Sequence, residues 1–196
     1  ATYFAETKES GDILEGLFNG SVVFEGLVLD QDMRWDLING LVMAGRIGLA
    51  EIEAEFAKDN TANGAKQAIM ARTSIPTPEG KKAGWNEVLN NKELSNTDIN
   101  FGSLGLVRAH DTSLLEPMVD WYFDAALNVW NSRTFKIAEY ILRGAYPVYL
   151  ANAELAERTR KFATSAEVSA IPALQRIMLE NLDAVDRALN AQKADN

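Results

Sequence analysis

Apolar residues recur at intervals of three and four positions along most of the chain. Trp35, Ile38 and Val42 show this spacing, and Glu and Asp residues fill the positions between such apolar residues in the following segments. An apolar stripe with this period is typical of a helix that packs one face against a core. The pattern predicts helices that contain residues 35–44, 49–56, 65–72, 83–89, 101–107, 114–130, 134–143 and 172–192.

Turn and capping residues separate these segments. Asp59-Asn60-Thr61 closes one helix and caps the next, and Thr77 followed by Pro78 is a favourable N-cap with proline at the first helical position. Ser95 or Asn96 can cap the helix after it. Only residues 20–28 have the pattern of an extended segment, so the sequence predicts an all-α protein with about eight to ten helices.

Many of these helices carry apolar residues around more than half of their circumference. Helices of this kind are buried between neighbours, which favours stacked antiparallel helix pairs, an α-solenoid. No sequence repeat recurs at a fixed period, and no low-complexity linker divides the chain. We therefore expect a single helical domain over residues 1–196.

Composition narrows the possible functions. The chain has no cysteine and one histidine, which excludes disulfides, thiolate zinc sites and any metal site that needs two histidines. Its net charge of −9 makes nucleic acid and anionic membranes unfavourable partners. No apolar run reaches the roughly 20 residues of a membrane span and no signal peptide precedes the domain, so we expect a cytoplasmic location. The missing initiator methionine indicates a fragment of a longer chain.

Local motifs for catalysis are absent from the sequence. A zincin site needs two histidines four residues apart, and His110 is the only histidine. Residues 59–64 resemble the first half of a calcium-binding loop, but Met70 stands where the bidentate glutamate belongs, so a helix cap is the better interpretation. The row Glu116, Asp120 and Asp124 lies on one face of its helix and is either a solvated face or a site for a cation or a basic ligand.

Five segments of the chain form an ordered series of motifs. Residues 30–37 (DQDMRWDL) are similar to the pattern D-x-D-x-R-W-x-L, and residues 51–64 to I-x-x-E-L-x-x-D-x-T-x-x-G. Residues 81–88, the Leu-Ser-Asn at 94–96 and the segment 172–189 continue the series. In this order the segments resemble the C-terminal helical domain of the zinc aminopeptidase N family of gluzincin metallopeptidases, most closely its actinobacterial-type members. The resemblance spans about residues 15–192.

The resemblance implies a HEAT-like helical domain that closes over the active site of the enzyme and limits entry to short peptides. The zinc ligands, HExxH and a downstream glutamate, would lie in an upstream catalytic domain, so zinc belongs to the parent enzyme and no catalytic or metal-binding residue is expected here. The expected partners are that catalytic domain and peptide substrates. Residues expected to line the peptide cleft are Arg34, Arg143, Glu116, Asp120 and Asp124.

Two further expectations accompany this one. The alternative to a peptidase domain is a stand-alone helical scaffold that binds a partner protein along a groove. A domain that packs on a catalytic partner should also expose an apolar patch. The first candidates for that patch are Tyr3, Phe4, Leu14, Leu17 and Phe18.

Overall fold

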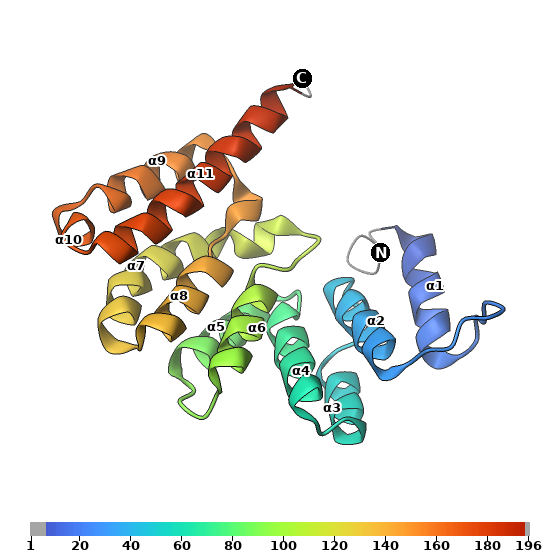
Figure 1. The fold of residues 1–196 in the computed structure, drawn as a ribbon. Helices are drawn as coiled ribbons and strands as arrows, with labels where there is room; N and C mark the ends of the chain where they lie inside the picture. Colours follow the sequence, from blue (N-terminus) through green and yellow to red (C-terminus); the bar gives the residue numbers. More distant parts are fainter. Residues whose placement is uncertain (1–6, 195–196) are drawn as a thin grey trace. The chain divides into compact units, whose positions relative to one another are not determined.

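The computed structural model describes residues 7–194, and helices joined by loops and turns make up this part of the chain (Figure 1). Helices account for 77% of the described residues and no strand occurs among them, which confirms the all-α prediction. The chain divides into two compact units, Ala1–Leu114 and Leu115–Asn196. Each unit is described by itself below, and a single domain over 1–196 stays a prediction.

The first unit contains six α-helices packed as successive neighbours. Helices α2, α4 and α6 pack side by side in sequence, while α1 packs on α2, α3 on α4, and α5 on both α4 and α6. This alternation of two helical layers is the solenoid-like packing that the apolar patterns indicate. The helices are α1 (Lys8–Asn19), α2 (Gln31–Met43), α3 (Leu49–Lys58), α4 (Ala62–Ser74), α5 (Pro78–Asn90) and α6 (Asn96–Leu106).

The second unit is organised around its long last helix, α11, which packs against α8, α9, α10 and η3. Tyr122 of α7 lies at the centre, where its hydroxyl donates to the carbonyl of Leu142 at 2.7 Å and accepts from Asn181 at 3.1 Å. One buried phenol thus joins α7, α8 and α11. The elements are η2 (Thr112–Leu115), α7 (Glu116–Ser132), α8 (Phe135–Gly144), η3 (Val148–Leu150), α9 (Ala153–Ala163), α10 (Ala166–Ser169) and α11 (Pro172–Ala194).

The predicted capping residues begin the helices. Thr61 accepts from the backbone N–H of Gly64, and Thr77 from that of Gly80, with Pro78 at the first helical position. Ser95, rather than Asn96, caps α6. The apolar patterns located eight of the helices within a few residues, but α1, α9 and the single-turn α10 were not predicted.

Two of the segments that resemble the aminopeptidase family contact each other directly. Arg34 of α2 donates two hydrogen bonds to the carboxylate of Glu55 in α3, at 2.8 and 2.7 Å. The indole N–H of Trp35 donates to Asp59 at 2.7 Å, and Asp59 also accepts from the hydroxyl of Thr61. These residue types at this spacing therefore join α2 to the α3–α4 corner, and the loop that resembles half a calcium site is a helix cap.

Residues 20–28 form a loop with defined turns, so the prediction of an extended segment is wrong. Gly20 ends α1 in the left-handed conformation, with φ of 81°. The N–H of Leu27 donates to the carbonyl of Phe24 at 3.1 Å, and Gly26, the third residue of that turn, has φ of 81°. This geometry is a type II turn, which requires a glycine-like conformation at that position.

The prediction of an exposed apolar patch near the N-terminus is also wrong for the three of its residues that the structure describes. Leu14 is only 9% exposed and packs with Leu37 and Leu41 in the core of the first unit. Leu17 and Phe18 are partly buried against the same core, whereas Tyr3 and Phe4 lie outside the described residues. Leu14, Leu17 and Phe18 thus stabilise the packing of α1 on α2.

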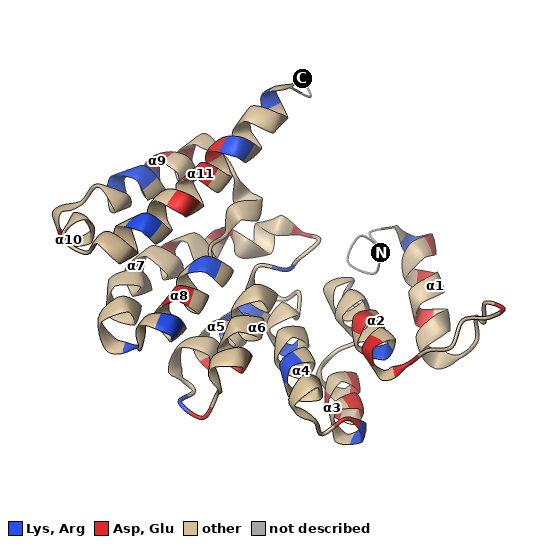
Figure 2. Cartoon of the chain, in the orientation of Figure 1, with Lys and Arg blue, Asp and Glu red and all other residues tan. Residues whose placement is uncertain are grey.

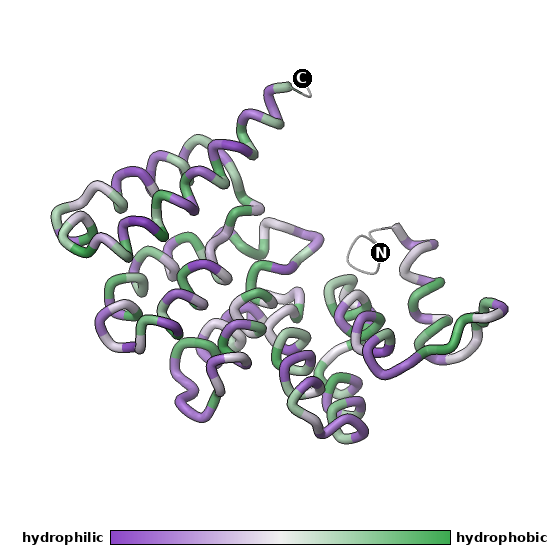
Figure 3. Tube along the Cα trace, in the orientation of Figure 1, coloured by the Kyte–Doolittle hydropathy of each residue, from purple (hydrophilic) through white to green (hydrophobic). Residues whose placement is uncertain are grey.

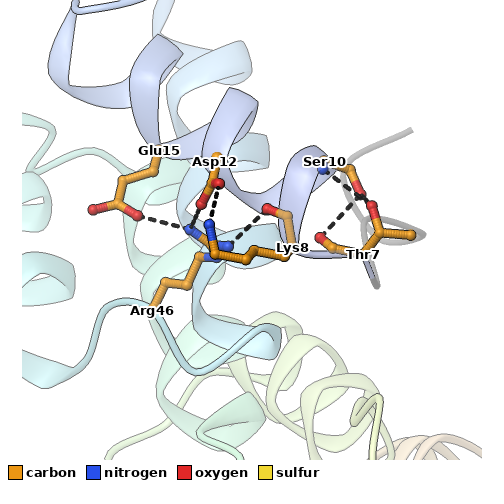
Figure 4. A network of polar contacts seen from close by, with 6 residues as sticks. All are labelled: Thr7, Lys8, Ser10, Asp12, Glu15 and Arg46. Carbon is orange, nitrogen blue, oxygen red and sulfur yellow. Dashed lines mark hydrogen bonds and ion pairs between the residues drawn. The ribbon is translucent and has the colours of Figure 1, made fainter.

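A single arginine reinforces that packing from the side (Figure 4). Nη1 of Arg46, which follows α2, donates to Asp12 at 2.7 Å and to Glu15 at 2.9 Å, and Nη2 donates to the carbonyl of Lys8 at 2.9 Å. A Cβ atom at Gly11 would lie 2.3 Å from Nε of Arg46, so a larger residue at this position would displace the guanidinium from its present contacts.

Candidate functional site

A groove of about 320 Å³ opens on the second unit, between α7 and the start of α9. Its walls combine carboxylates with aliphatic side chains. The lining residues are Glu116, Val119 and Asp120 from α7, Leu150 from η3, and Asn152, Glu154, Leu155 and Arg158 from the N-cap and first turns of α9. The groove therefore contains two of the residues predicted for the peptide cleft, Glu116 and Asp120.

Arg158 fixes the spacing of the two helices that form the groove. Its guanidinium forms an ion pair with Asp120 of α7 and lies 4.8 Å from the ring centre of Phe123 on the same helix. Phe123 in turn packs edge-on against Phe162 of α9, with 5.3 Å between ring centroids. Ring and ion-pair contacts thus hold α7 and α9 in register on either side of the groove.

The groove carries more negative than positive charge. Glu116 and Glu154 are exposed and form neither an ion pair nor a side-chain hydrogen bond within residues 7–194, while Asp120 is neutralised by Arg158. Glu116 lies in the first turn of α7 and Glu154 in the first turn of α9, where the helix macrodipole favours a carboxylate. The two carboxylates thus stay available for a cationic ligand without destabilising their helices.

The other residues predicted for a cleft lie elsewhere. Arg34 belongs to the first unit and is committed to Glu55, with its guanidinium 5.2 Å from the ring centre of Phe18. Arg143 of α8 forms ion pairs with Glu139 and Glu180. Asp124 is exposed on α7 but does not line the groove. The structure brings together Glu116 and Asp120 only, and the cleft role of all five residues stays a prediction.

Sequence reasoning missed the half of the groove that α9 contributes. The sequence marks the start of α9 by two residues only. Asn152 is the N-cap, whose side chain accepts from the N–H of Leu155 at 2.8 Å, and Glu154 follows in the first turn. That pattern locates the start of a helix. It does not reveal that Glu154 and Arg158 lie opposite Glu116 and Asp120, because that proximity comes from tertiary packing.

A second missed residue is Lys81, which is completely buried in the first unit. Its Nζ donates to the carbonyl of Arg108 at 2.6 Å and lies 3.3 to 3.5 Å from the carbonyls of Thr73, Ser74 and Gly105. These acceptors are at or beyond the C-terminal ends of α4 and α6, where unpaired carbonyls concentrate negative partial charge. Burial lowers the pKa of Lys81 to about 7.

Neither a metal site nor a membrane-spanning helix is found among the described residues. No cluster of three or more His, Asp or Glu side chains in residues 7–194 is arranged to hold a metal ion, so the part of the chain seen here does not fit a zinc site. None of its helices is both long and apolar enough to cross a membrane. Charged residues are spread over the helices of both units (Figure 2).

The fold defines a class: an all-helical protein of stacked helix pairs, with a groove between α7 and α9. The sequence model of one family, the ERAP1-like C-terminal domain, matches residues 3–187. The chain belongs to this family. It is also 36% identical over 191 residues to Aminopeptidase N of Streptomyces lividans, an alignment that covers 97% of this chain and 22% of that protein.

The chain thus spans about a fifth of the length of the curated relative that it matches. The match covers both compact units and agrees with the resemblance found in the sequence. It identifies the chain as a C-terminal domain of an aminopeptidase-type protein. Two of the segments that carry this resemblance, residues 30–37 and 51–64, are joined by the Arg34–Glu55 and Trp35–Asp59 contacts, which are structural.

Proposed function

We propose that this chain is the non-catalytic C-terminal domain of a zinc-dependent, cytoplasmic aminopeptidase that releases N-terminal residues from peptides. The observation that carries the proposal is the alignment with Aminopeptidase N over 97% of the chain but only 22% of the relative. Residues 7–194 provide no zinc site, so in this proposal the metal would be held by a catalytic part elsewhere in the polypeptide.

In this proposal the domain covers the catalytic cleft, restricts entry to short peptides and contacts the bound peptide. The α7–α9 groove is the surface that supports a peptide contact. Its aliphatic residues Val119, Leu150 and Leu155 match the stem of a lysine or arginine side chain, and Glu116 and Glu154 match its charge. The groove would therefore bind a basic side chain of the substrate.

The assignment of a non-catalytic domain is tested by comparing this chain with the full-length polypeptide. The purified chain should neither retain stoichiometric zinc nor hydrolyse an aminoacyl-anilide, and the full-length protein should do both. Robust zinc-dependent turnover by the chain alone would refute the proposal.

The groove is tested in the full-length enzyme with a charge-matched pair of variants. Glu116→Gln with Glu154→Gln removes the two unpaired carboxylates of the groove, and Asp124→Asn with Glu167→Gln removes two exposed carboxylates of the same unit outside it. Exposed charges contribute roughly 0.2–1 kcal/mol each, so KM for lysine-containing peptides should rise several-fold in the groove variant only. Equal changes in both variants, or equal changes with neutral peptides, would exclude the groove as the site.

A further inference from the structure

Apolar side chains that the fold leaves uncovered are concentrated in one short loop of the first unit. Among the described residues, ten large apolar side chains are exposed, and four of them, Val23, Phe24, Leu27 and Val28, lie within six positions. Val23 is 79% exposed and Val28 is 81% exposed. Figure 3 shows hydrophobic stretches along this connection between α1 and α2. We call residues 23–28 the apolar loop.

The loop is held in place from both ends. The N–H of Val22 donates to the carbonyl of Gly16 at 3.0 Å, and a Cβ at Gly16 would lie 2.4 Å from Cγ2 of Val22, so Val22 packs closely on α1. At the other end Leu29 packs against the core residues Leu14, Leu37 and Leu41.

Between these anchors the type II turn at Gly26 reverses the chain. The exposed side chains are therefore presented by a defined backbone with both ends fixed. A small groove of about 110 Å³ lies beside them, lined by residues 17, 20, 22–24, 27 and 29.

A contiguous apolar surface that stays exposed to water is often an interaction site. Isolated apolar side chains on a surface need no explanation, but a contiguous patch of roughly 300–600 Å² is the largest that a typical monomer shows and is often functional. Here the apolar loop projects from the pair of helices α1 and α2 (Figure 1), while the neighbouring side chains Leu14, Leu17 and Phe18 are already used in the core. Exposing Val23, Phe24 and Val28 to water is unfavourable unless another surface covers them.

Resting on the proposed function, we propose that the apolar loop is the surface by which this domain docks on the remainder of its own aminopeptidase polypeptide, through an apolar patch on that remainder. The aligned region is 22% of the aminopeptidase relative, so most of such a polypeptide is available as the covering surface. Charge argues against a lipid surface: residues 20–33 include Glu25, Asp30 and Asp32 and no lysine or arginine. The matching patch would be apolar with basic residues at its edge.

The test measures amide hydrogen exchange of peptides that cover residues 20–29, in this chain and in the full-length polypeptide. Docking predicts at least about tenfold slower exchange of the loop in the full-length protein. A peptide around Phe135, whose side chain is 57% exposed, provides the internal reference. Equal exchange of the apolar loop in an active full-length enzyme overturns the docking inference and leaves the proposed function intact.

A matched pair of variants adds a second readout. Val23→Ser with Phe24→Ser changes the loop, and Leu49→Ser with Phe135→Ser changes exposed apolar side chains elsewhere. In the full-length enzyme the loop variant should restore fast exchange in residues 20–29, and the control should not. Self-association of this chain that the loop variant abolishes would assign the loop to a second copy and overturn the proposal. A chain that exists in its cell only as a separate polypeptide would overturn both this inference and the proposed function.

Discussion

Glu55→Gln should destabilise the first unit by about 3 kcal/mol, although the change replaces one side chain by another of nearly the same shape. The carboxylate is 1% exposed and accepts two hydrogen bonds from Arg34, with further donors from Gln31 at 3.0 Å and Lys58 at 3.2 Å. A glutamine amide presents one acceptor oxygen instead of two and no charge. The variant leaves the guanidinium of Arg34 without its counter-charge in a mostly buried position.

The magnitude follows from the titration of the group. The hydrogen bonds from Arg34 lower the pKa of Glu55 from its ordinary 4.5 to about 2, against the opposing effect of burial. Each unit of difference between folded and unfolded pKa corresponds to about 1.4 kcal/mol, so the ionised form contributes about 3 kcal/mol. Because the folded pKa is the lower one, this stability is fully present above pH 4.5 and is lost as the pH falls towards 2.

The assay is urea denaturation followed by circular dichroism at pH 7, 4 and 3, with Glu53→Gln as the matched control. Glu53 lies on the same helix and forms a similar two-bond pair with Arg72, at 2.6 and 2.9 Å, but it is 47% exposed. An exposed pair of this kind contributes at most about 1 kcal/mol. The reasoning is refuted if both variants lose the same stability, or if Glu55→Gln keeps the steep acid dependence of the wild type.

Three further predictions test the packing. Burial lowers the pKa of Lys81 from its ordinary 10.5 to about 7, so between these pH values the unfolded chain binds a proton that the folded chain does not. The free energy of unfolding of the wild type should therefore rise from pH 7 to 10.5. Chemical denaturation at several pH values should show that Lys81→Met lacks this rise. Gly11→Ala should lower the free energy of unfolding by at least about 1 kcal/mol more in the wild type than in an Arg46→Ala background, because the added methyl group has space only when the arginine is absent. A double-mutant cycle of melting curves measures this difference. Tyr122→Phe should cost about 1–2 kcal/mol, because Leu142 and Asn181 lose their hydroxyl partner, and Tyr149→Phe, at an exposed site, should cost almost nothing by the same assay.

The helices and their starts could be predicted because the signals are local. Thr61, Thr77 and Ser95 each cap a helix through a residue three positions later, and the stripes of α2 and α7 repeat within a few turns. The α7–α9 groove could not be predicted in full, because Glu116 and Arg158 come together only through packing between helices 20 residues or more apart in sequence. An apolar loop and an apolar strand share a similar composition, so the sequence pattern alone does not distinguish the turns at Gly20 and Gly26 from an extended segment.

Lys81 shows the same limit on a single residue. It falls four and seven positions before Trp85 and Val88, on the apolar stripe of α5, which is the signal that could have marked it as buried. The apolar stripe does not predict that the carbonyls at the ends of α4 and α6 lie beside the ammonium group of Lys81. Those acceptors make a buried lysine tolerable, and they are assembled by the fold.

We propose that this chain is the non-catalytic part of a larger zinc aminopeptidase, and the coding sequence in its source genome is the decisive measurement. One continuous reading frame should extend several hundred residues upstream of Ala1 and include an HExxH motif followed by a downstream glutamate. A start codon adjacent to Ala1, with no such frame before it, would refute the proposal.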